Sequence, residues 1–214
     1  MNGLICFALK EEAAAFRPHA SARPGLNTLI VGIGRANASR SVQAFLRGTH
    51  PDWVYTCGFA GGLAPDLQVG DLVHDTATTA PETARKLVAL GVKPARFHCA
   101  DRIAITVAEK KALRERTGAE VVEMESAAIH AACQAAGIPC TTLRVISDTA
   151  GEDLPLDFNA LSKPDKSLDF GRLAWAVARS PGRIPHLLRL QKNSARAAAE
   201  LARVLAALTA PAHP

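Results

Sequence analysis

Residues 120–148 read EVVEMESAAIHAACQAAGIPCTTLRVISD, and this stretch decides the fold class. A short apolar run is followed by an alanine-rich segment that stops at Gly137, and a second apolar run begins directly after a proline. Glycine just past the last helical residue, with proline beyond it, is typical of a helix end. The stretch predicts a strand near Glu120–Val122, a helix over Glu125–Ala136 and a strand over Cys140–Ile146, which is the repeating unit of an α/β protein.

The same alternation continues back to the start of the chain. Strands are expected at Gly3–Leu9, Leu26–Ile33, Trp53–Cys57 and Asp71–Thr76, and helices at Glu11–Arg17, Ala36–Arg47, Glu82–Leu90 and Ala108–Thr117. This order favours a mixed, largely parallel sheet with helices on both faces. Asp153–Asp169, which contains two prolines, is expected to be a loop. We therefore expect an α/β domain over residues 1–170, with residues 171–214 as a basic, amphipathic helical extension of the same domain.

Charge is concentrated in that C-terminal extension. Residues 171–214 hold seven Lys or Arg and one Glu, whereas residues 1–170 hold 18 basic and 19 acidic residues. Apolar residues recur between the basic ones at helical spacing: Ile184, Leu187, Leu188, Leu190, Leu201, Val204, Leu205 and Leu208. Such a helix can lie on an anionic membrane, bind an acidic partner, or pack on its own domain with a solvated basic face. Nucleic acid is not expected as a partner, because only Trp175 could offer a stacking surface in this region.

Composition excludes several classes of protein. No apolar run reaches the roughly 20 residues that cross a bilayer, and the first run lacks the flanking charges and cleavage site of a signal peptide. A cytoplasmic protein is therefore expected. The five cysteines form no CxxC pair and the seven histidines no HxxxH or HExxH pair, so we expect free thiols, no metal site and no cofactor.

Polar groups follow three of the predicted strands. They lie in Lys10-Glu11-Glu12, in the segment from Thr56 to Gly62 and in Ser147-Asp148-Thr149. Because ligands of open α/β sheets bind at the carboxyl ends of strands, these segments nominate a site. The glycines of the second segment fit either a tight turn or a place where a ligand touches main chain. Glu123, Met124 and Glu125 lie at a strand-to-helix junction, where capping acids and a core methionine are the alternative interpretation.

Five motifs, in this order, resemble the nucleoside phosphorylase/nucleosidase family. They are Ala8-Leu9-Lys10-Glu11-Glu12, Gly32-Ile33-Gly34, Cys57-Gly58-Phe59-Ala60-Gly61-Gly62-Leu63 with Val69-Gly70-Asp71, Val122-Glu123-Met124-Glu125-Ser126-Ala127, and Arg144-Val145-Ile146-Ser147-Asp148. They span about residues 1–150 and are most similar to those of the methylthioadenosine/S-adenosylhomocysteine nucleosidases. The resemblance implies a three-layer α/β/α sandwich with a mixed central sheet, and a homo-oligomer.

The resemblance also implies roles for single residues. Glu12 aligns with the acid that activates the attacking water, and Asp148 with the general acid that protonates a purine at N7. Glu125 aligns with the acid that binds the ribose hydroxyls, and Met124 with the residue beneath the sugar. The other expected substrate-binding residues are Gly34, Phe59, Gly61, Glu123 and Asp101, of which Asp101 is the candidate base contact or, alternatively, a helix cap.

The proposed general acid has a requirement of its own. A purine anion is a poor leaving group, so its departure needs a proton. Asp148 must therefore hold a proton near neutral pH, which calls for burial or a nearby carboxylate.

Two departures from the family pattern affect the expected reaction. Thr56 and Phe59 stand where phosphorylases hold phosphate, so water is the expected nucleophile, with Arg35 as the remaining candidate anion ligand. Residues 152–157 and the basic tail are similar to the hopanoid-associated branch, which removes adenine from adenosylhopane to leave ribosylhopane. This similarity implies a nucleosyl-lipid substrate and attachment to the inner face of the membrane. The alternatives are a nucleosidase for methylthioadenosine, S-adenosylhomocysteine or futalosine, a phosphorylase, and a non-catalytic nucleoside-binding protein.

Overall fold

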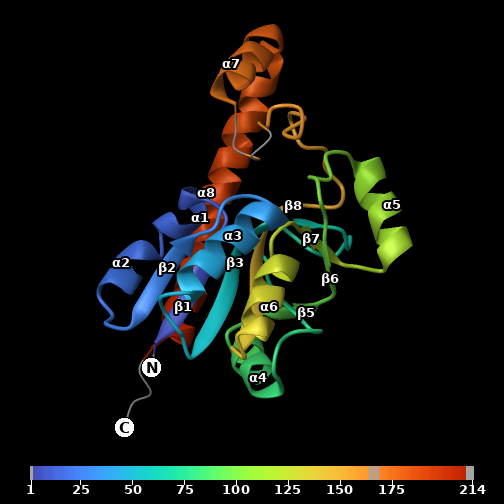
Figure 1. Cartoon of the computed structure of the whole chain (residues 1–214). Helices are drawn as coiled ribbons and strands as arrows, with labels where there is room; N and C mark the ends of the chain where they lie inside the picture. The colour runs from blue at the N-terminus through green and yellow to red at the C-terminus, as the bar shows by residue number, and fades with distance from the viewer. Residues whose placement is uncertain (1, 164–165, 167–168, 211–214) are drawn as a thin grey trace.

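The computed structural model describes residues 2–163, 166 and 169–210 and shows a central sheet between two layers of helices (Figure 1). The sheet contains β1 (Gly3–Phe7), β2 (Leu26–Ile30), β3 (Trp53–Gly62), β4 (Leu72–Asp75), β5 (Lys93–Ala95), β6 (Phe97–Cys99), β7 (Val121–Glu123) and β8 (Cys140–Asp148). Its main path runs β2-β1-β3-β8-β4-β5, and β7 pairs with β3 and β6. Because β4 is antiparallel to β8 while β1, β2, β3 and β8 are parallel, the sheet is mixed, as predicted.

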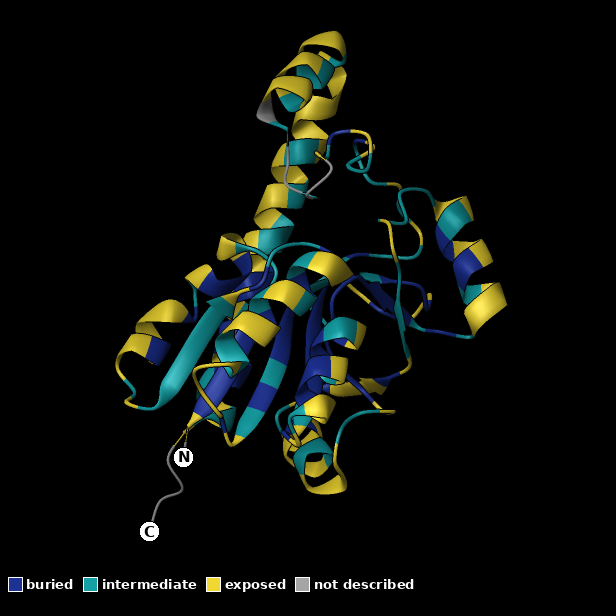
Figure 2. Ribbon diagram, in the orientation of Figure 1, coloured by how far each residue is buried: buried dark blue, intermediate teal, exposed yellow. Residues whose placement is uncertain are grey.

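Alternate residues of β1 enter two separate cores. Ile5 and Phe7 pack toward α1 (Lys10–Ala14) and the end of the last helix. Leu4 and Cys6 pack on the other face, toward α3 (Arg35–Leu46) and α6 (Ser126–Ala135). Successive side chains of a strand point to opposite faces, so a strand buried on both sides must be apolar throughout. All five residues of β1 are buried, which confirms the three-layer arrangement (Figure 2).

The chain forms further helices besides α1. They are α2 (Arg17–Ser21), α3 (Arg35–Leu46), α4 (Pro81–Ala89), α5 (Val107–Thr117), α6 (Ser126–Ala135), α7 (Phe170–Arg179), the 3₁₀ turn η1 (Pro181–Arg183) and α8 (Ile184–Leu208). No helix in the described part of the chain is long and apolar enough to cross a membrane.

The C-terminal helix α8 has two unlike halves. Its second half packs on the sheet, where Ala197, Leu201 and Leu205 are completely buried. Its first half and α7 project away from the sheet (Figures 1 and 2), and Trp175 and Leu188 are each 60% exposed. Packing on the domain, one of the three possibilities left open by the sequence, thus applies to the second half. We call α7, η1 and residues 184–192 of α8 the projecting hairpin.

The structure differs from the sequence prediction around the glycines after residue 57. These residues were expected to follow a strand that ends at Cys57, but β3 continues to Gly62. The reason is that the glycines leave room for neighbouring side chains, so the strand can pass close beneath them. The short strands β5 and β6 were not predicted, because three residues are too few to show a period. The expected loop is without helix or strand in its described part; residues 164–165, 167–168 and 211–214 lie outside the described residues.

Candidate active site

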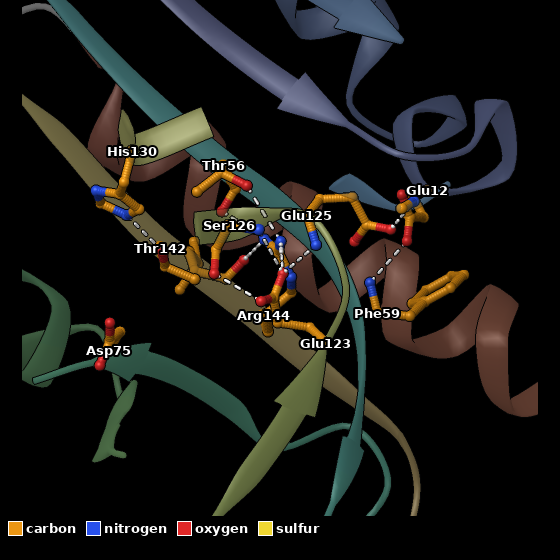
Figure 3. A network of polar contacts seen from close by, with 12 residues as sticks. Glu12, Thr56, Phe59, Asp75, Glu123, Glu125, Ser126, His130, Thr142 and Arg144 are labelled. Carbon is orange, nitrogen blue, oxygen red and sulfur yellow. Dashed lines mark hydrogen bonds and ion pairs between the residues drawn. The ribbon is translucent and has the colours of Figure 1, made fainter. Parts of the chain in front are cut away.

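Glu12 is held at the end of β1 by two main-chain groups. The Leu9 N–H donates to its Oε2 at 2.9 Å and the Phe59 N–H to its Oε1 at 2.8 Å (Figure 3). A Cβ at Gly58, where φ is +150°, would lie 2.6 Å from Oε1, so only glycine leaves space for this carboxylate. Burial raises the pKa of Glu12, and the two N–H donors oppose the rise. Glu12 is thus a fixed carboxyl group that binds a proton more readily than an exposed glutamate does.

Glu125 lies at the start of α6 and faces the same space. Its Oε1 accepts the Gly34 N–H at 2.8 Å, and Gly34 adopts φ of +84° at the start of α3. Burial, followed by the negative charge of Glu123, raises the pKa of Glu125 to about 7. The main-chain N–H of Gly34 therefore positions the carboxyl group of Glu125.

Glu123 is engaged inside the protein. Its oxygens accept from the Ser126 hydroxyl at 2.6 Å, from the N–H groups of Glu125 and Ser126, and from Arg144 Nη2 at 2.8 Å. Burial alone would raise the pKa of Glu123, but Arg144 and the Ser126 donors outweigh it and the pKa is lowered. Glu123 borders the site, yet these contacts suit it to orient Glu125 and Arg144 rather than to bind substrate.

Arg144 lies at the centre of the site, although no role was predicted for it from the sequence. It is completely buried on β8 and also donates to the Thr56 carbonyl at 2.6 Å and the Thr56 hydroxyl at 3.1 Å. Its positive charge partly offsets the rise in pKa that burial causes in both Glu12 and Glu125. The signal in the sequence was an arginine inside an apolar strand, because a buried charge needs partners.

Asp148 ends β8 and is buried, as expected for a general acid. Its close charged neighbour, however, is not a carboxylate. Lys110 Nζ lies 2.7 Å from Asp148 Oδ2, and the Ser147 hydroxyl donates to Oδ1 at 2.7 Å. Of the two alternatives expected, burial is present, and the charged group that α5 brings to this position is a lysine rather than a carboxylate.

These side chains share one cavity of about 230 Å³. Its walls include six of the residues singled out from the sequence: Glu12, Phe59, Gly61, Met124, Glu125 and Asp148. Glu123 also borders it, and Gly34 lies behind Glu125 as its donor. Glu12 thus follows β1, Asp148 ends β8 and Glu125 lies at the start of α6. A nucleoside in the cavity would contact all three acids.

Asp101 does not join this cavity. Its side chain is 86% exposed and its Oδ1 lies 3.4 Å from Arg35 Nε. Ile103 and Ala104 of the same loop line the cavity in its place. The prediction that Asp101 contacts the base is therefore corrected, because its side chain lies at the surface, paired with Arg35. The same pairing, with a bond to the Cys99 carbonyl, engages Arg35 away from the cavity.

Glu125 gives a testable dependence of stability on pH. Its pKa is about 7 in the folded chain against an ordinary 4.5, so the folded state binds the extra proton between these values and loses stability as the pH rises through them. We expect Glu125→Gln, which keeps an oxygen for Gly34, to be more stable than wild type at pH 8 by roughly 1–3 kcal/mol. Urea unfolding at pH 5 and pH 8 measures this difference. An equal difference at both pH values would contradict the assignment.

The fold and the three carboxyl groups around one cavity define an enzyme of the nucleoside-cleaving α/β type. A family model described as "Phosphorylase superfamily" matches residues 74–179. The 5'-methylthioadenosine/S-adenosylhomocysteine nucleosidase of Anoxybacillus flavithermus is 31% identical, over 74% of this chain and 90% of that protein. The chain belongs to the phosphorylase superfamily and, within it, is an enzyme of the nucleosidase group.

Solved structures show the same fold. The Campylobacter jejuni 5'-methylthioadenosine/S-adenosyl homocysteine nucleosidase superposes with a TM-score of 0.70 at 18% identity, covering 97% of this chain and 98% of that one. Futalosine hydrolase of Helicobacter pylori superposes with a TM-score of 0.67 at 17% identity, covering 96% and 95%. At these identities the likeness establishes the fold, which agrees with the predicted three-layer sandwich.

Proposed function

We propose that the protein hydrolyses the N-glycosidic bond of a 5′-substituted adenosine, releasing adenine, and that its substrate is adenosylhopane, which becomes ribosylhopane. The observation that carries this proposal is a second cavity that adjoins the reaction cavity. Leu154 and Leu190 line both the reaction cavity and this second one of about 450 Å³. A ribose bound at Glu125 could therefore carry a large 5′ substituent.

The three carboxyl groups supply the steps of such a hydrolysis. Glu12 takes a proton from a water molecule as that water attacks C1′, and Asp148 gives a proton to N7 of the departing purine. Glu125 accepts hydrogen bonds from the ribose hydroxyls, and Met124 packs beneath the sugar. Water is favoured over phosphate because Arg35 is paired with Asp101 and Phe59 occupies the wall beside Glu12. No cofactor enters these steps.

The projecting hairpin supports a lipid-bearing substrate. Exposed Trp175, Ile184 and Leu188 lie on it among basic residues, and Arg183, His186 and Arg189 border the second cavity. An apolar surface with a basic rim is typical of proteins that lie on anionic lipid. We infer peripheral attachment at the inner face of the membrane, next to the substrate entrance. The homo-oligomer implied by the family resemblance stays a prediction.

The basic lining of the second cavity also favours a second candidate. Arg183, His186 and Arg189 face Glu152 and Asp153 there, and such a lining suits a charged 5′ substituent like that of S-adenosylhomocysteine. One comparison decides: purified protein is incubated with adenosylhopane, S-adenosylhomocysteine or methylthioadenosine, with and without phosphate, and the released adenine and sugar product are measured. Faster cleavage of the hopanoid, independent of phosphate, supports the proposal. Faster cleavage of S-adenosylhomocysteine replaces it with the second candidate.

Membrane attachment is tested separately by flotation with liposomes. We expect binding to anionic vesicles at low salt and release as salt is added, since each basic residue near such a surface contributes about 1 kcal/mol. Changing the exposed Arg179, Arg189 and Lys192 to Gln should abolish flotation. The matched control removes the same charge from the body of the domain through Arg40→Gln, Arg47→Gln and Arg203→Gln. Equal loss in both triple variants, or no flotation of the wild type, would contradict attachment through the hairpin.

A further inference from the structure

Lys110 is a completely buried cation next to the reaction cavity. It lies on α5, and its Nζ has three partners: Asp148 Oδ2 at 2.7 Å, the Thr149 carbonyl at 2.6 Å and the Glu152 carbonyl at 2.9 Å. Nζ donates hydrogen bonds to the two carbonyls and forms an ion pair with the Asp148 carboxyl group. Burying a charge is costly unless it is paired in this way. The side chain is thus fixed between the end of β8 and the loop after it.

The two oxygens of Asp148 are consequently not equivalent. Oδ2 is held by Lys110, whereas Oδ1 accepts only the weaker, rotatable hydroxyl of Ser147 in the described contacts. The Ser147 hydroxyl also lies 3.3 Å from the Ala60 carbonyl. It can turn to that acceptor when Oδ1 carries a proton, because a hydroxyl hydrogen rotates freely. Oδ1 is therefore the oxygen that can hold and deliver a proton.

We propose that Lys110 is a positioning residue for leaving-group protonation: its ammonium holds Oδ2 of Asp148, so that Oδ1 faces the purine and delivers the proton. This role rests on the proposed function of Asp148. The proton passes from Oδ1 to N7 while the bond between C1′ and N9 breaks, and the electron pair of that bond leaves with the purine. Lys110 keeps its own three protons. The carboxylate formed in this step appears beside a fixed positive charge, which stabilises the transition state that leads to it.

A second contact connects this residue to the substrate entrance. The two carbonyls bound by Lys110 belong to the loop that leads into Leu154, and Leu154 lines both cavities. Lys110 thus fixes the acid and the loop beside the 5′ end of the substrate as one unit.

A double-mutant cycle tests this role. Lys110→Met, Asp148→Asn and the double variant are compared on the nucleoside that the wild type cleaves fastest. We expect Lys110→Met to lower kcat by about 10- to 100-fold with KM little changed, as for a displaced catalytic group. The double variant should match Asp148→Asn in kcat, because Lys110 acts on proton transfer only through Asp148. The double variant also leaves no buried carboxylate without a partner. It therefore keeps the test valid if Lys110→Met alone fails to fold. A further tenfold loss in the folded double variant would overturn the proposal.

The leaving group provides a readout that a merely structural role would not change. The 4-nitrophenolate group of a 4-nitrophenyl riboside departs without protonation. Cleavage of this substrate by Lys110→Met should therefore stay near the wild-type rate, while purine release falls. Equal losses on both substrates would also overturn the proposal. Lys111→Met is the matched control, because Lys111 is the next residue of α5, is 75% exposed and lies 4.0 Å from Glu115. If the wild type cleaves no nucleoside at all, the proposed function itself fails; if it is active and Lys110→Met is equally active, only the role of Lys110 fails.

Discussion

Asp148→Asn is expected to lower the turnover of purine nucleosides by about 10²–10⁴-fold, the usual range for the loss of a general acid. The amide keeps the size of the side chain and an oxygen for Lys110 Nζ, which lies 2.7 Å from Asp148 Oδ2. It cannot give a proton to N7, so the loss should fall on kcat. Steady-state kinetics with detection of released adenine measures it, and thermal unfolding checks that the variant is folded.

The structure offers a matched control for this variant. Asp101→Asn makes the same chemical change on a side chain that is 86% exposed and paired with Arg35 outside the cavity. We expect its turnover to stay close to that of the wild type. Near wild-type turnover in Asp148→Asn would remove Asp148 from the mechanism. A large loss in Asp101→Asn would instead restore Asp101 as a base contact and require the loop to move on substrate binding.

Local sequence patterns predicted the parts of the molecule that repeat. Strand β1 was predicted because an uninterrupted apolar run stops at Lys10, and helix α6 because an alanine-rich segment stops at Gly137. Glu12 and Asp148 were predicted to share a site because the ends of parallel strands meet at one edge of a sheet, whereas the role of Glu125 came from the family resemblance. The structure brings all three acids to one cavity, although Glu125 follows β7, which is antiparallel to β3.

The predictions that the structure did not match concern contacts between segments that are far apart in the sequence. Asp101, in the loop between β6 and α5, pairs with Arg35 at the start of α3, and no local pattern records that pairing. Lys110 and Lys111 are adjacent and chemically identical, yet one is completely buried and the other 75% exposed. Only the contacts of Lys110 with Asp148 at the end of β8 and with the loop after it distinguish them. Residues Gly58–Gly62 were expected outside the strand because glycine is typical of turns; here it leaves space for Glu12.

Glu12→Gln is expected to lower turnover by about 10²–10⁴-fold while substrate still binds. Both oxygens of Glu12 accept main-chain N–H groups, from Leu9 and Phe59. A glutamine has one oxygen, so its NH₂ group must face one of these donors, and the variant should also lose some stability because that N–H has no acceptor. Glu11→Gln is the matched control, because Glu11 is the exposed neighbour on the same helix.

A second variant separates the position of the carboxyl group from its chemistry. Gly58→Ala keeps Glu12 but places a Cβ 2.6 Å from its Oε1 and strains a backbone with φ of +150°. The carboxyl group must then shift, so turnover should fall although the acid is still present. Equilibrium binding of a non-hydrolysable substrate analogue, measured beside single-turnover rates, distinguishes the steps. Weakened binding with normal single-turnover chemistry in Glu12→Gln would place Glu12 in substrate binding and leave the activation of water to another group.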